Sequence, residues 1–215
     1  MNAQVMSLNV ATDADVITGI RTKRSGRTGI GKRPVTGRVS TGHDQLAGDT
    51  ICDTANHGGV DQAVYAYAVE DAQWWATQLD RDLGPGAFGE NLTTAGLDVT
   101  GAVIGQLWAI GSAVLEVSCP RIPCRVFQEF WDVPRLVKWF TEVGRPGAYL
   151  RIHTPGELAA GDDIVVVHTP AHGVTIGETF RALTGDRSLA ARLLEAPELP
   201  AESHRSARRW LAEAV

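Results

Sequence analysis

Short extended segments separated by Gly, Pro and Asp fill residues 1–168, and this pattern limits the possible folds more than any other feature of the chain. The segments are rich in β-branched and aromatic residues, which favour strands. We expect strands at 35–40, 64–69, 103–110, 114–118, 148–153 and 164–168. Their spacing predicts a barrel or a strongly curved sheet.

Two helices are expected to interrupt these strands. A helical period over 69–79 places Ala72, Trp75 and Leu79 on one face, and a second helix is expected over 134–143 with Gly144 as its C-cap. The Trp74-Trp75 pair is interpreted as core packing rather than as a ligand-binding box.

Beyond Thr169-Pro170 the pattern becomes helical. Segments at 175–183, 188–194 and 201–214 are broken by glycine and proline, which end helices. The sequence therefore predicts an α+β chain: a β-rich, barrel-like domain over residues 1–168, followed by a small three-helix C-terminal region over residues 169–215.

Composition excludes several classes of partner. No apolar run approaches the roughly 18 residues that a membrane span needs, and the start of the chain lacks the layout of a signal peptide, so we expect a cytoplasmic protein. The net charge of −5 gives no general attraction to nucleic acid. The basic run at 21–38 contains no aromatic residue on which bases could stack. Two interpretations of this run stay open, a basic rim for a phosphate-bearing small molecule and a solvated flexible loop.

The stretch SCPRIPC at 118–124 carries the most specific chemical signal. Its two prolines exclude a helix and stiffen the loop, while Arg121 and Arg125 flank Cys124. Nearby positive charge lowers a thiol pKa toward the thiolate, which is the form that attacks or binds metal. The alternative is a buried structural cysteine. A Cys119–Cys124 disulfide or a structural zinc site is not favoured, because the cysteines lack the usual context and spacing.

Three further polar stretches lie beside predicted strand ends. The segment 56–62 offers His57 and Asp61 after a turn, the segment 86–92 offers Glu90 and Asn91, and the segment 144–151 offers two arginines suited to phosphate. A tight turn, a side-chain cap and a surface ion pair are the respective alternatives. No motif of a serine hydrolase, a P-loop or a dinucleotide-binding fold is present, although cysteine proteolysis through Cys124 and His57 stays formally open.

Taken together and in order, these stretches resemble the MOSC family, and within it the YiiM-like branch. The pieces that carry the resemblance are GIGKRPV (29–35), NHGGVDQAVYAY (56–67), GAFGENLTTAGL (86–97), VSCPRIPC (117–124), GRPGAYLRI (144–152) and GELAAGDDI (156–164). The likeness runs over residues 29–167, and the helical tail is similar to the three-helix extension of that branch.

This resemblance implies a barrel-like fold with a molybdenum cofactor (molybdopterin) in its cleft. It implies that Cys124 is the molybdenum ligand, which agrees with the softness of a thiolate. The other residues carried over by their motifs are His57 and Asp61 near the metal or pterin, Glu90 and Asn91 at the pterin edge, and Arg33, Arg121 and Arg145 at its phosphate.

The implied reaction is the reduction of N-hydroxylated bases or amines, such as 6-hydroxylaminopurine, with His57 or Asp61 assisting proton delivery. No flavin or iron–sulfur motif is visible, so the electrons would come from a separate reductase. The alternative from another class is a protein that only carries the molybdenum cofactor, or sulfur as a Cys124 persulfide. The sequence leaves open whether the protein forms a homodimer.

Overall fold

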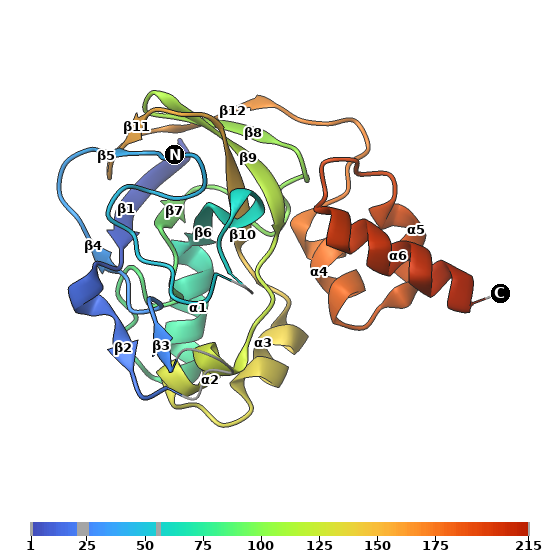
Figure 1. The fold of residues 1–215 in the computed structure, drawn as a ribbon, viewed down its shortest axis with the longest axis horizontal. Coiled ribbons are helices and arrows are strands. Elements are labelled where there is room, and N and C mark those ends of the chain that lie inside the picture. Colours follow the sequence, from blue (N-terminus) through green and yellow to red (C-terminus); the bar gives the residue numbers. More distant parts are fainter. Residues whose placement is uncertain (1, 21–25, 55–56, 215) are drawn as a thin grey trace.

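An eight-stranded sheet forms the centre of the computed structural model, which describes residues 2–20, 26–54 and 57–214 (Figure 1). The strand order is β12-β8-β9-β10-β6-β7-β1-β4, and every neighbouring pair is antiparallel except β6 and β7. The strands are β1 (Gln4–Val10), β4 (Arg33–Pro34), β6 (Val64–Ala68), β7 (Leu92–Ala95), β8 (Leu107–Ile110), β9 (Ala113–Pro120), β10 (Ala148–Thr154) and β12 (Ile164–His168). Two small ribbons pair β2 (Ile17–Thr18) with β3 (Arg27–Thr28), and β5 (Val39–Ser40) with β11 (Glu157–Leu158).

The sheet curves until β1 approaches the beginning of β12. Gln4 and Asp163 form an isolated antiparallel bridge, and the Ile164 N–H donates to the Ala3 carbonyl at 2.8 Å. Within the described residues this contact does not extend into a ladder, so the sheet is not closed into a continuous barrel. The predicted α+β class is confirmed. The sheet is also curved, as the pattern of short strands indicated.

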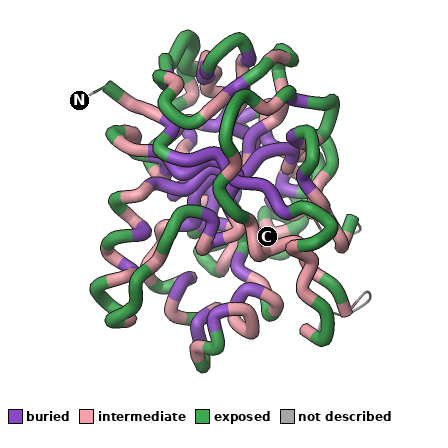
Figure 2. The backbone as a smooth tube through the Cα atoms, turned by 90° about the vertical axis from the view of Figure 1, so that its left-hand side faces the viewer, coloured by how far each residue is buried: buried purple, intermediate pink, exposed green. Residues whose placement is uncertain are grey.

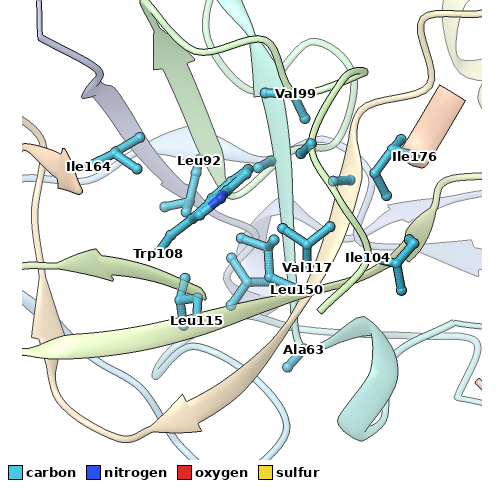
Figure 3. Close-up of a cluster of buried hydrophobic side chains, with 14 of the residues drawn as sticks. Ala63, Leu92, Val99, Ile104, Trp108, Leu115, Val117, Leu150, Ile164 and Ile176 are labelled. Carbon is cyan, nitrogen blue, oxygen red and sulfur yellow. The ribbon is translucent and has the colours of Figure 1, made fainter. Parts of the chain in front are cut away.

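The inner face of the sheet forms the larger of two apolar clusters (Figure 3). Along β9, Ala113, Leu115 and Val117 are buried, while Val114 and Glu116 between them are only partly buried, as expected for the two-residue period of a strand. Trp108 from β8 and Leu150 from β10 point into the same interior (Figure 3). The buried residues accordingly gather at the centre of the molecule, with exposed loops around them (Figure 2).

Three helices cover the second apolar cluster, which is mainly aromatic. They are α1 (Val69–Leu79), α2 (Arg125–Trp131) and α3 (Leu136–Val143). Trp75 is fully buried and stacks on Phe140, with ring centroids 5.5 Å apart and planes 13° apart. The packing interpretation of Trp75 is therefore confirmed. The helix over 69–79 was predicted with the correct bounds, whereas α2 was not predicted.

The C-terminal helices α4 (Ile176–Thr184), α5 (Ala190–Leu193) and α6 (Ala201–Glu213) lie to one side of the sheet (Figure 1). Thr175 caps α4 by accepting a hydrogen bond from the Glu178 N–H at 3.1 Å. Ile176 and Leu193 belong to the same apolar cluster as the sheet interior, so the helices pack on the sheet. The division into two domains at residue 168 stays a prediction. Of the helices in the described part of the chain, none has the length and apolar character needed to cross a bilayer.

Candidate functional site

A cleft with about 790 Å³ of empty space, including the part open to solvent, lies between several loops. Its walls come from loops at 27–32, 49–53, 57–63 and 88–91, from the loop before α2, and from Tyr149 on β10. The cleft brings together four of the residues that the sequence singled out, namely His57, Asn91, Arg121 and Cys124. Residues 21–25 of the basic run, and Asn56 in the glycine-rich motif, lie outside the described residues, but Arg27 and Lys32 of that run line the cleft.

Cys124 lies at the end of the proline loop, defined here as residues 120–124, and is the N-cap of α2 in extended geometry (φ −123°, ψ 170°). The side chain is half-buried and lines the cleft. Burial raises the pKa of its thiol, but the His57 side chain, the Arg121 guanidinium and the backbone N–H of Phe127 lower it by more, to about 7. About half of a thiol with this pKa is thiolate at neutral pH. The loop therefore holds a reactive sulfur in place.

Arg121 supplies fixed positive charge beside that sulfur. Its side chain is 5% exposed, and the guanidinium lies over the rings of Phe127 at 4.2 Å and Tyr65 at 5.5 Å. Within the described residues its Nη1 is buried without a hydrogen-bond partner. Buried polar groups are rarely left unpaired, so this donor in the cleft wall is available to a ligand or to an ordered water.

A second wall of the cleft is built on a buried ion pair that sequence reasoning missed. The Lys32 ammonium donates to both oxygens of the Asp49 carboxylate, which also accepts from the Asn91 amide at 2.9 Å and the Ala11 N–H at 2.8 Å. Burial lowers the pKa of Lys32, and the Asp49 charge opposes this shift. The Asn91 amide oxygen meanwhile accepts from the Tyr65 N–H at 3.1 Å. Lys32 lies within the GIGKRPV motif, and this motif was the one feature of the sequence that could have indicated that Lys32 belongs to the site.

Glu90 holds the neighbouring loop together and does not line the cleft. Its carboxylate accepts from the N–H groups of Gly86 and Phe88 at 2.6 and 2.9 Å, and from the Thr93 hydroxyl at 2.7 Å. Burial raises the pKa of this carboxyl. Gly89 has φ +75°, and a Cβ there would come within 2.9 Å of Ile30, so the loop needs glycine at this position.

Asp61, Arg33 and Arg145 are not brought to the cleft, because each is engaged by a neighbour elsewhere. The partners are Arg151 for Asp61 at 2.6 Å, Asp15 for Arg33 at 2.8 Å, and Asp71 for Arg145 at 3.2 Å. Arg33 is also highly exposed, with 77% of its side chain accessible. Their predicted roles in binding stay predictions, and the geometry gives them no support.

The other two cysteines differ from Cys124, and all three are free thiols. Cys119 is 7% exposed, and its thiol donates to the Asp61 carbonyl at 3.9 Å. Burial raises the pKa of Cys119 to about 11. Cys52 lines the cleft, but burial raises its pKa as well. Cys124 is therefore the thiol of the cleft that is best suited to bind or react as thiolate.

Fold and site together define an α+β protein with a curved sheet and a cleft that presents a thiol of lowered pKa beside fixed positive charge. The chain belongs to the MOSC domain family, whose model matches residues 53–165. It is 35% identical over 149 residues to the uncharacterized protein YflK of Bacillus subtilis (strain 168), covering 69% of this chain and 67% of YflK. It is 30% identical over 159 residues to protein YiiM of Escherichia coli (strain K12), covering 71% of this chain and 70% of YiiM.

Two further likenesses are to a solved structure and to part of a longer protein. The crystal structure of YiiM from Geobacillus stearothermophilus superposes with a TM-score of 0.80 at 27% identity, covering 97% of this chain and 99% of that one. A protein named reductase from Gibberella moniliformis (strain M3125 / FGSC 7600) is 30% identical over 151 residues, which are 68% of this chain but only 27% of that protein. The chain therefore shares the YiiM fold including the C-terminal helices, and it matches about a quarter of a longer reductase.

Proposed function

We propose that this protein binds a molybdenum cofactor and reduces N-hydroxylated bases or amines with electrons from a separate reductase. The observation that carries the proposal is the Cys124 thiol, which lines the cleft with its pKa lowered to about 7 beside His57 and Arg121. Membership of the MOSC family supports the class of cofactor. The reductase name of the fungal relative supports the class of reaction.

The residues of the cleft fit such a cofactor. A thiolate is a soft ligand of the kind that transition metals prefer, and Cys124 supplies it from a stiff loop. Arg27, Lys32 and Arg121 bring positive charge into the walls, which suits an anionic group, although Asp49 offsets the charge of Lys32. When bound, the cofactor would supply two-electron chemistry and accept oxygen from the substrate.

The overall reaction is R–NH–OH + 2 e⁻ + 2 H⁺ → R–NH₂ + H₂O, with the N–O bond broken and the nitrogen reduced. Because the departing oxygen must be protonated, a group beside Cys124 has to deliver protons. His57 lines the cleft and contacts Cys124, whereas Asp61 is paired with Arg151. We therefore assign proton delivery to His57, while Arg121 holds positive charge next to the sulfur.

The first test is the molybdenum and pterin content of wild type, Cys124→Ser and Cys119→Ser, produced in a host that makes the cofactor. We expect metal near one equivalent in wild type and Cys119→Ser, and its loss in Cys124→Ser. Cys119 is the matched control, because it is a thiol five residues away that does not line the cleft. Full retention of metal by Cys124→Ser would refute its role as ligand.

A second assay separates catalysis from carriage. The same low-pKa thiol also suits a carrier that holds the cofactor, or sulfur as a persulfide, without reducing anything. Loaded wild-type protein should oxidise a reduced viologen dye when an N-hydroxylated base is added. Stoichiometric molybdenum with no dye oxidation would favour the carrier.

A further inference from the structure

Tyr149 on β10 lines the same cleft as Cys124 and His57. Its neighbours Ala148 and Leu150 are fully buried in the interior of the sheet, and successive residues of a strand point to opposite faces. Tyr149 is itself only half-buried. Its side chain therefore points away from the core and toward the cleft.

A β-bulge lies where Tyr149 meets β9. Tyr149 pairs with Cys119, but the following pair of the ladder skips Ser118, so β9 carries one extra residue at this point. Bulges bend a strand and are over-represented next to active sites, where they re-aim side chains. This bulge comes directly before the proline loop, so the strand bends beside Tyr149 where the segment that carries Arg121 and Cys124 begins.

The chain has three tyrosines, and their hydroxyl groups differ. Tyr65 lies opposite Tyr149 on β6, with ring centroids 5.2 Å apart, and its hydroxyl donates to the Pro146 carbonyl at 2.8 Å. The Tyr67 hydroxyl donates to the Arg145 carbonyl at 3.2 Å. Among the residues that the structure describes, the Tyr149 hydroxyl has no such acceptor. Its O–H is therefore free to donate into the cleft.

Arg121 places a second free donor near this hydroxyl, since its Nη1 has no partner in the described part of the chain. Burial raises the pKa of Tyr149 to about 12, the Arg121 charge opposes this shift, and charge at Cys119 and Cys124 adds to it. The phenol therefore keeps its proton at neutral pH, close to both the guanidinium and the sulfur of Cys124. Two hydrogen-bond donors thus border one space beside the reactive thiol.

Two donors suit an oxygen atom that gains negative charge. When the N–O bond of a hydroxylamine breaks, the oxygen takes the electron pair of that bond and one proton. The nitrogen takes the two electrons that are supplied and the other proton. Until it is protonated, the departing oxygen carries developing negative charge. Fixed donors aimed at such an oxygen stabilise the transition state more than the ground state.

Resting on the proposed function, we propose that the Tyr149 hydroxyl, together with Arg121, donates a hydrogen bond to the oxygen that leaves the substrate nitrogen. Tyr149 is then a catalytic residue. The phenol keeps its own proton, and the proton that turns this oxygen into water comes from His57. The hydroxyl groups of Tyr65 and Tyr67 serve only packing, because backbone carbonyls already occupy them.

The experiment compares Tyr149→Phe with the matched control Tyr67→Phe in cofactor-loaded protein. Both changes remove one hydroxyl and keep the ring, and Tyr67 belongs to the same aromatic cluster without lining the cleft. The substrate is an N-hydroxylated purine, and the electron donor is reduced viologen.

We expect Tyr149→Phe to lower kcat about a hundredfold, the effect of one donor lost from a developing oxyanion. KM should stay within about twofold of wild type, because the lost interaction forms mainly in the transition state. Molybdenum and pterin content should equal that of wild type. Tyr67→Phe should leave kcat within about threefold of wild type and lower Tm instead, since it leaves the Arg145 carbonyl without its donor.

The outcomes separate this role from the proposed function. If wild type with full molybdenum does not reduce the purine, the proposed function fails, and the role of Tyr149 fails with it. If wild type is active and Tyr149→Phe retains kcat within about threefold, the role of Tyr149 is wrong while the proposed function stands. The same holds if Tyr149→Phe loses molybdenum, which would make the hydroxyl a support of the cofactor, or if Tyr67→Phe lowers kcat equally.

Discussion

The ion pair between Lys32 and Asp49 in the cleft wall offers a test of the structure by stability alone. The side chains are 8% and 2% exposed, so neither charge has water as an alternative partner. Replacing one member of a buried pair leaves the other as an uncompensated buried charge, which costs about 3–5 kcal/mol. The isosteric change Asp49→Asn creates no cavity, but it also replaces one acceptor oxygen by an NH2 group, so the hydrogen bond from Asn91 or from Ala11 is lost together with the charge. For a chain of 215 residues the cost corresponds to a fall in Tm on the order of 10 °C.

The assay is urea unfolding of cofactor-free protein, followed by the fluorescence of its six tryptophans. The double variant Lys32→Met/Asp49→Asn buries no charge, so we expect it to recover the part of the loss that comes from the uncompensated charge. The matched control is Asp162→Asn, whose carboxylate pairs with the 45% exposed Arg38 and should cost at most about 1 kcal/mol. A loss below about 1 kcal/mol for Asp49→Asn, or a double variant no more stable than the single one, would refute the reasoning.

Three further predictions follow from individual side chains. Burial lowers the pKa of Lys32 below its unfolded value of 10.5, so the unfolded chain binds this proton more tightly than the folded chain does. The free energy of unfolding therefore gains a contribution that rises as the pH approaches 10.5. Lys32→Met should lose that rise, and identical profiles of unfolding free energy against pH for the two proteins would contradict the prediction. In cofactor-free protein, the rate at which iodoacetamide modifies Cys124 should rise with a midpoint near pH 7, while Cys119 stays unmodified, as measured by peptide mass spectrometry. His57→Ala should move this midpoint to higher pH. An unchanged midpoint would exclude the His57 contact. Trp75→Ala should cost about 3–5 kcal/mol in urea unfolding, because it empties a fully buried site, and a cost below about 1 kcal/mol would contradict that packing.

Local patterns were sufficient for much of the fold. The helix α1 has the predicted bounds because an apolar period of 3.6 residues needs no information from the rest of the chain. The helix α2 was missed, because seven residues after two prolines give little periodic signal. The strand β7 was missed because three of its four residues are buried, which removes the alternation that marks a half-exposed strand.

The candidate site was harder to predict than the fold. Polar residues near predicted strand ends were assigned to binding by their motifs, yet a motif does not reveal which way a side chain points. Asp61 is engaged by a residue 90 positions away, and Arg145 by one 74 positions away. Glu90 instead closes its own loop through bonds to residues within four positions.

The sequence by itself determined the family, the α+β class, the bounds of α1 and the proline loop that presents Cys124. These depend on spacing and on the fixed backbone of proline, which are properties of neighbouring residues. Only the tertiary structure decided which polar groups line the cleft, because ion pairs form between residues that are distant in the chain. Asp61 and Arg145, which were expected near the ligand, do not line the cleft, whereas Lys32, Asp49 and Gln62 do. The physical reason is that a charged side chain leaves water only where the folded chain supplies a partner for it.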